Sequence, residues 1–134
     1  MPQRASLVSL LRGLSLINFA AVVAVVAPQA WLAACHEALG LGAFPAAPIT
    51  GYLARSTSLW FASFGVLLWL VSREPRHYVH LITFLGWAML IQGLMMIGID
   101  WSERMPGWWI VIEGPTCVLL GVAILSLNGS DSST

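Results

Sequence analysis

The residues Trp108–Leu127, WWIVIEGPTCVLLGVAILSL, form an apolar run that contains a single charged side chain, Glu113. About 20 mostly apolar residues are enough to cross the roughly 30 Å hydrocarbon core of a bilayer. We therefore predict a transmembrane helix over about 107–127. A carboxylate in hydrocarbon costs about 2.5–3.5 kcal/mol on insertion scales, so Glu113 needs a partner, a proton or a water-filled pocket.

The composition of the whole chain is that of a membrane protein. Of its 134 residues, 58% are hydrophobic and 9% are charged, whereas soluble domains average about 25% charged residues. Three further segments, at about 6–27, 52–71 and 79–99, are long and apolar enough to span a bilayer. Short turns after the second and third spans make neighbouring helices antiparallel. The sequence therefore predicts one all-α domain over 1–134, an integral membrane four-helix bundle.

The link between the first and second predicted spans carries its own helical signal. Pro28 suits the first turn of a helix, and Gly40 is a natural stop. Apolar residues between them recur at helical spacing, which predicts a short interfacial helix at about 29–40. The alternative is a first helix that is kinked at Pro28 and continues to Ala34. Beyond the fourth span, residues 128–134 are polar and are predicted to form a disordered tail.

The arginines indicate whether the N-terminal segment is a signal peptide and how the chain is oriented in the membrane. Two of them precede the first apolar run, as in a signal peptide, but Pro28 interrupts the obvious cleavage site, so we expect a retained helix. Positive residues favour the cytoplasmic side of a membrane protein. The N-terminus and the turn at 72–77 carry four arginines and the opposite side carries two, so both termini are predicted to be cytoplasmic. These arginines are Arg4, Arg12, Arg73 and Arg76, against Arg55 and Arg104.

A polar cluster is the candidate functional site. Arg55 enters the second span from the same side as Glu113 enters the fourth, at a similar depth of roughly 9 Å. Arg55 shares a helix face with small residues such as Ala62, and such faces pack against neighbouring helices. We therefore predict a buried Arg55–Glu113 pair, with Asp100 and Gln92 of the third span beside it.

This cluster has several interpretations. The Arg55–Glu113 pair either sets helix register only or lines a polar pocket, and a third reading leaves Glu113 unpaired and protonated. Asp100 and Gln92 have simpler roles as an interface residue and an interhelical hydrogen-bonding residue. No catalytic motif, cofactor motif or metal-ligand spacing is recognisable, so we expect no enzymatic activity and neither cofactor nor metal. Six arginines balance six acidic residues, which leaves no basic surface for nucleic acid.

Several stretches resemble an uncharacterised family of small bacterial four-helix inner-membrane proteins. The resemblance covers most of residues 28–127 and implies an inner-membrane location, but it brings no activity. We expect a structural or accessory membrane component that contacts the lipid bilayer and associates with itself or with another membrane protein. The alternative is a small-molecule binder or transporter that uses the cluster around Arg55 and Glu113. The stretches that carry the resemblance are His36–Gly42, Pro48–Ser56, Gly98–Asp100, Trp108–Trp109 and Glu113–Pro115.

Overall fold

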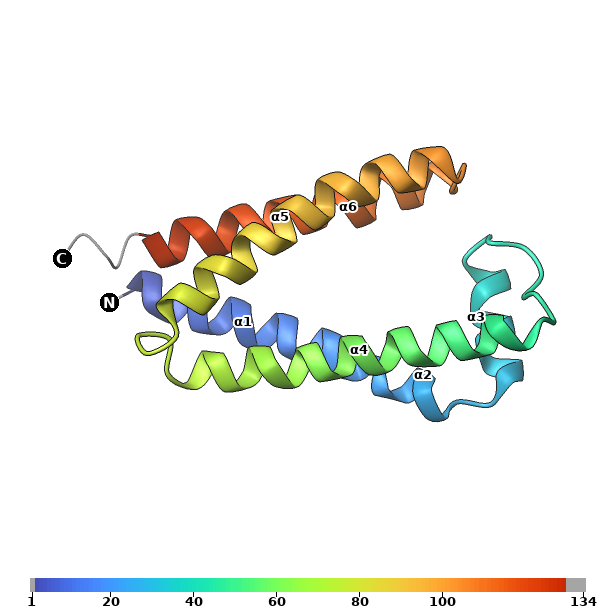
Figure 1. Ribbon diagram of the computed structural model, residues 1–134, viewed down its shortest axis with the longest axis horizontal. Coiled ribbons are helices and arrows are strands. Elements are labelled where there is room, and N and C mark those ends of the chain that lie inside the picture. Colours follow the sequence, from blue (N-terminus) through green and yellow to red (C-terminus); the bar gives the residue numbers. More distant parts are fainter. Residues whose placement is uncertain (1, 130–134) are drawn as a thin grey trace. The chain divides into compact units, whose positions relative to one another are not determined.

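A computed structural model describes residues 2–129, and these residues form helices and connecting turns with no strand among them. Four helical segments are long and apolar enough to cross a membrane, which confirms the predicted all-α fold class (Figure 1). The chain forms two compact units, one of them Leu11–Leu70 and the other made of the residues on either side. The predicted single domain over 1–134 stays a prediction. The four segments are Gln3–Val26, Pro48–Arg73, Val79–Ser102 and Gly107–Gly129.

The first membrane-length segment consists of α1 (Pro2–Ala20) and α2 (Val22–Val26). The chain then leaves the helix, because Ala27 and Pro28 are extended, with ψ angles of 142° and 145°. Proline lacks the N–H that would continue the helix, and it disfavours helical geometry in the residue before it. The kinked continuation to Ala34 is therefore wrong.

A separate helix α3 (Gln29–Ala38) follows, as the sequence predicted at about 29–40. Its end is a Schellman motif, in which the Leu41 N–H donates to the His36 carbonyl at 3.1 Å and the Gly40 N–H donates to the Glu37 carbonyl at 2.9 Å. Gly40 has a φ of +73°, which a glycine adopts without the steric cost of a Cβ. The stop signal read from Gly40 is confirmed.

Helix α4 (Pro48–Arg73) begins earlier than the predicted span at 52–71. It packs closely on α1, where the Ser15 Oγ donates to the Gly65 carbonyl oxygen at 2.7 Å. A Cβ placed on Gly65 would lie only 2.6 Å from the backbone nitrogen of Phe19. Glycine at this position is therefore what lets the two helices approach backbone to backbone.

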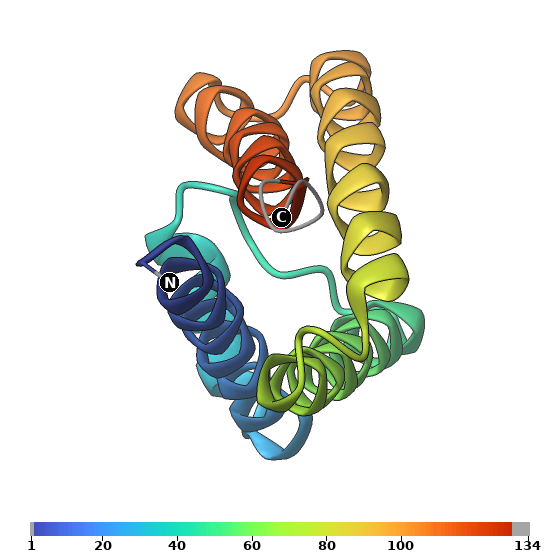
Figure 2. The ribbon, with the colours of Figure 1, turned by 90° about the vertical axis from the view of Figure 1, so that its left-hand side faces the viewer.

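Helices α5 (Val79–Ser102) and α6 (Gly107–Gly129) form an antiparallel hairpin, and they lie side by side in both Figure 1 and Figure 2. A Cβ on Gly93 of α5 would lie 2.7 Å from the Gly114 carbonyl oxygen, and a Cβ on Gly121 of α6 would lie 2.8 Å from the Gly86 carbonyl oxygen. On each helix the two glycines are a heptad apart, so they share one face. We call these four residues the glycine seam.

The open end of the hairpin is joined by a side chain. The Asn128 Nδ2 donates to the Val79 carbonyl oxygen at 3.0 Å and to the Thr83 Oγ1 at 2.9 Å. The prediction of a disordered tail from residue 128 is therefore wrong for Asn128 and Gly129, because these bonds tie the end of α6 to the start of α5. The rest of that predicted tail, residues 130–134, lies outside the described residues.

Candidate functional site

Arg55 binds the end of the first membrane-length segment. Its Nη1 donates to the Val25 carbonyl oxygen at 2.6 Å, and its Nη2 donates to the Ala27 carbonyl oxygen at 2.9 Å. The last carbonyls of a helix have no intrahelical donor, and Pro28 cannot supply one because it has no N–H. The planar guanidinium presents donors to two carbonyls at once, and its positive charge suits a helix C-terminus.

In a membrane, this contact satisfies carbonyl groups that would otherwise lack hydrogen bonds. A backbone carbonyl without a hydrogen bond costs several kcal/mol in hydrocarbon. Arg55 removes that cost for two carbonyls where α2 ends. Arg55 was predicted to lie on the face of its helix that packs against neighbouring helices. Its side chain does contact protein, and Ala62 and Gly65 on the same face are buried.

Glu113 lies at a small cavity in the first turns of α6. Its Oε2 accepts a hydrogen bond from the Trp109 Nε1, one turn earlier on the same helix. The cavity has a volume of about 240 Å³ and is lined by Trp108, Trp109, Ile112 and Glu113. The two indole rings meet edge to face, with centroids 5.2 Å apart. The half-buried carboxylate thus lies beside aromatic walls, an arrangement that favours a cation.

Asp100 continues the face of α5 that carries the glycine seam, one heptad after Gly93. The sequence placed it at the end of the third span, but α5 extends to Ser102 and Asp100 is only 2% exposed. Its Oδ2 has no hydrogen-bond partner within residues 2–129. Its backbone carbonyl oxygen accepts from the Met105 N–H at 2.9 Å in the turn that leads to α6. The Oδ2 atom is therefore a buried acceptor that these residues leave unsatisfied.

Gln92 has the opposite environment. It lies near the middle of α5, and its side chain is exposed. Within its own unit, the described residues give its amide no hydrogen bond, and the predicted interhelical bond stays a prediction. An apolar medium supplies neither a donor nor an acceptor, so this amide needs hydrogen-bonding partners from outside its unit.

The predicted cluster is distributed over both compact units. Arg55 lies in Leu11–Leu70, whereas Gln92, Asp100 and Glu113 lie in the other unit. Each of the two charged residues proposed as a pair has a hydrogen-bond partner within its own unit. The Arg55–Glu113 pair therefore stays a prediction.

Sequence reasoning missed three features of these sites. They are the capping of α2 by Arg55, the Trp109–Glu113 hydrogen bond and the glycine seam. The seam had a readable signal, because Gly86 and Gly93 on one helix and Gly114 and Gly121 on the other repeat at heptad spacing. The capping contact had none, since it joins residues that are 30 and 28 positions apart.

The metal-binding side chains and the thiols are dispersed among the described residues. Among the described residues, no group of three or more His, Cys, Asp or Glu side chains is placed to hold a metal ion. Cys35 and Cys117 are free cysteines. Comparison with protein-family models, with curated proteins and with solved structures finds no match for this chain.

Proposed function

We propose that this chain is a non-enzymatic, structural or accessory component of a bacterial inner membrane that associates with a second copy of itself. The four membrane-length helices support a multi-pass protein. The arginine distribution supports cytoplasmic termini, and the resemblance to small bacterial membrane proteins supports the location.

The exposed amide of Gln92 is the observation that carries self-association. A buried amide without hydrogen bonds costs roughly 2–7 kcal/mol in an apolar medium. Lipid chains offer neither a donor nor an acceptor, so Gln92 favours a protein surface over lipid. Side-chain hydrogen bonds between transmembrane helices contribute about 0.6–2 kcal/mol each.

A second copy fits this surface because an amide is its own chemical complement. Two α5 helices related by a two-fold axis place one Gln92 against the other, and each side chain then donates to and accepts from its partner. The exposed residues around it are apolar and include Ile91 and Met95. Two copies paired here therefore need no further polar partner at this depth.

Gln92→Leu is expected to weaken dimerisation in lipid vesicles by about 7–700-fold. Loss of two interhelical hydrogen bonds removes about 1.2–4 kcal/mol, and about 1.4 kcal/mol corresponds to tenfold. Energy transfer between donor-labelled and acceptor-labelled full-length chains, measured over a range of protein-to-lipid ratios, gives the dimerisation constant.

Two variants control this measurement. Gln92→Asn keeps an amide and is expected to retain part of the affinity, whereas Leu94→Ala changes an exposed apolar residue of the same helix and is expected to be neutral. A wild-type chain that stays monomeric, or a Gln92→Leu chain that dimerises like the wild type, would refute the proposal.

A second candidate function is the binding of a small organic cation at Glu113. The observation in its favour is the cavity of about 240 Å³, in which a carboxylate stands beside two tryptophans. Ammonium groups are attracted to the faces of aromatic rings, and a nearby negative charge adds to that attraction. The sequence predicted a small-molecule site around Arg55 and Glu113, and this candidate places the site at the residues around Glu113 only.

Glu113→Gln is expected to lower the affinity for tetraethylammonium by at least about tenfold, because it removes the charge and keeps the shape. Calorimetric titration of the full chain in a neutral detergent measures this affinity. Glu103→Gln is the matched control, since it removes an exposed acid near the turn between α5 and α6. Equal affinities for the wild type and Glu113→Gln would exclude this candidate.

A further inference from the structure

Arg12 is a charged side chain inside the first membrane-length segment. Its guanidinium lies over the ring of Trp69, 5.4 Å from the ring centroid. The side chain is exposed, and within the unit Leu11–Leu70 it forms neither a hydrogen bond nor an ion pair. Arginine stays protonated in proteins, so Arg12 cannot lower the cost of its burial in a membrane by losing its charge.

The depth of Arg12 makes a counter-ion important. It lies roughly 14 Å along the helix from Gln3, at about 1.5 Å per residue. A long side chain can reach back toward the membrane surface from this position. The Trp69 ring under its guanidinium lies four residues, or roughly 6 Å, before the end of α4, and from there the guanidinium can reach the phosphate of a phospholipid.

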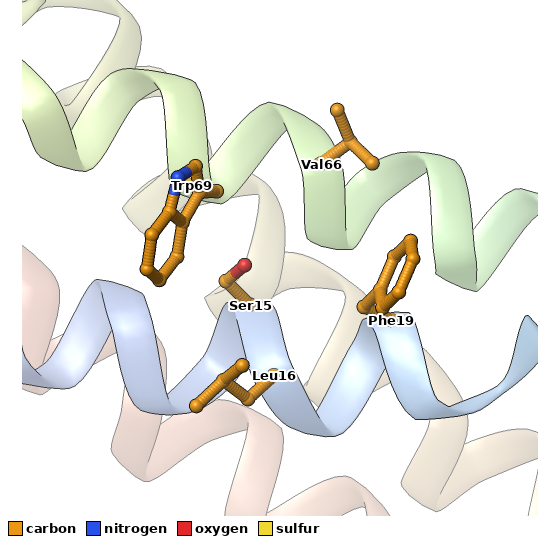
Figure 3. A pocket seen from close by; sticks show the side chains of 5 residues that line it. All are labelled: Ser15, Leu16, Phe19, Val66 and Trp69. Atoms are coloured by element: carbon orange, nitrogen blue, oxygen red, sulfur yellow. The ribbon is translucent and has the colours of Figure 1, made fainter.

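A groove begins where Arg12 contacts Trp69. It has a volume of about 270 Å³, and it lies between α1 and α4 within the unit Leu11–Leu70. Figure 3 shows the Trp69 and Phe19 rings at its two ends. The lining is almost wholly apolar, because the one hydroxyl, of Ser15, donates to the Gly65 carbonyl oxygen. The lining residues are Ser15, Leu16, Phe19, Val66 and Trp69.

The charge and the groove together specify one kind of occupant. Arg12 precedes Leu16 and Phe19 by one and two turns of α1, so the cation lies at the end of the groove nearer the N-terminus. An anionic phospholipid has the same order of parts along the membrane normal, with a phosphate at the surface and an acyl chain below it. Guanidinium groups also bind phosphate through two parallel hydrogen bonds.

We propose that this groove is a binding site for an anionic phospholipid, with the phosphate on Arg12 and one acyl chain against Leu16, Phe19 and Val66. The site is independent of the proposed dimer, because it lies on α1 and α4 rather than on α5. Anionic lipids attract basic residues near a membrane surface, and each such residue contributes about 1 kcal/mol.

The test is native mass spectrometry of the full-length chain released from micelles that contain equal amounts of phosphatidylglycerol and phosphatidylcholine. The wild type is expected to retain phosphatidylglycerol about fivefold to tenfold more often than phosphatidylcholine. Arg12→Gln is expected to lose this preference, and Arg12→Lys is expected to keep most of it because it keeps the charge. Arg73→Gln is the matched control, since it removes an exposed arginine outside the groove and is expected to leave the preference intact.

The acyl-chain contact is tested separately. Val66→Trp fills the groove without changing its charge, so it is expected to lower retention of phosphatidylglycerol about fivefold or more. Added inorganic phosphate, which has no acyl chain, is expected not to displace the lipid. The proposal is overturned if the wild type shows no preference, if Arg12→Gln behaves like the wild type, if Arg73→Gln loses the preference equally, or if phosphate displaces the lipid.

Discussion

Replacing Gly93 with alanine is expected to lower the free energy of unfolding by about 1–3 kcal/mol, the range for overpacked contacts. The added Cβ would lie 2.7 Å from both the Gly114 carbonyl oxygen and the Val118 backbone nitrogen. Both obstructing atoms belong to the backbone of α6, so no side-chain rotation relieves the contact and the helices must separate. Alanine alone would favour the helix by up to about 1 kcal/mol, so the expected sign is opposite to that in an isolated helix.

Gly98→Ala provides the matched control because it lies on the same helix with nothing within 4 Å of its added Cβ. It is expected to be neutral or slightly stabilising. Both variants are measured by reversible unfolding of the full chain in mixed micelles with increasing sodium dodecyl sulfate, followed by circular dichroism. Equal changes for Gly93→Ala and Gly98→Ala would show that the glycine seam does not hold α5 and α6 together.

Replacing Arg55 with methionine is expected to lower the free energy of unfolding by about 3–6 kcal/mol. The substitution keeps an elongated side chain and removes two charge-assisted hydrogen bonds, each of which contributes about 1.5–3 kcal/mol. The carbonyls of Val25 and Ala27 then lose the donors that the structure provides. Arg55→Lys is expected to recover part of this loss, because lysine restores the charge but lacks the planar pair of donors. An unfolding curve for Arg55→Met that matches the wild type would contradict the capping role.

A double-mutant cycle that combines Arg55→Met with Glu113→Gln also tests whether the predicted Arg55–Glu113 pair forms. Residues in direct contact show interaction energies of about 0.5–3 kcal/mol, whereas independent residues add to within about 0.5 kcal/mol. Coupling in the upper range would establish the ion pair in addition to the capping contact. Additivity would leave Arg55 as a cap of α2 and Glu113 as the partner of Trp109.

The membrane-length helices and the bounds of α3 were readable from local signals. The apolar run that ends at Leu127 specifies a span because its length matches the thickness of the bilayer. Pro28 and Gly40 bound α3 through their own backbone properties, namely a missing N–H and an accessible positive φ. Each of these effects acts over a few neighbouring residues, so no knowledge of the packing was needed.

The partners of the polar residues were not readable in this way. Local patterns placed Arg55 on a protein-facing side of its helix. They could not show that its guanidinium would donate hydrogen bonds to the carbonyls of Val25 and Ala27. They marked Asn128 as part of a polar tail, although its amide joins α6 to Val79. A hydrogen bond requires two groups within about 3 Å, and that distance depends on helix register.

The register between helices therefore separates the features that local sequence predicts from the contacts that only the folded structure shows. Hydrophobic length and the backbone limits of proline and glycine act along the chain, so the amino-acid order alone establishes four membrane-length helices and the short helix α3. The close approach at Gly93 and Gly114 and the satisfied carbonyls at the end of α2 arise only when separate helices meet. These contacts depend on which side chains face each other after folding, and membrane hydrophobicity does not encode that choice.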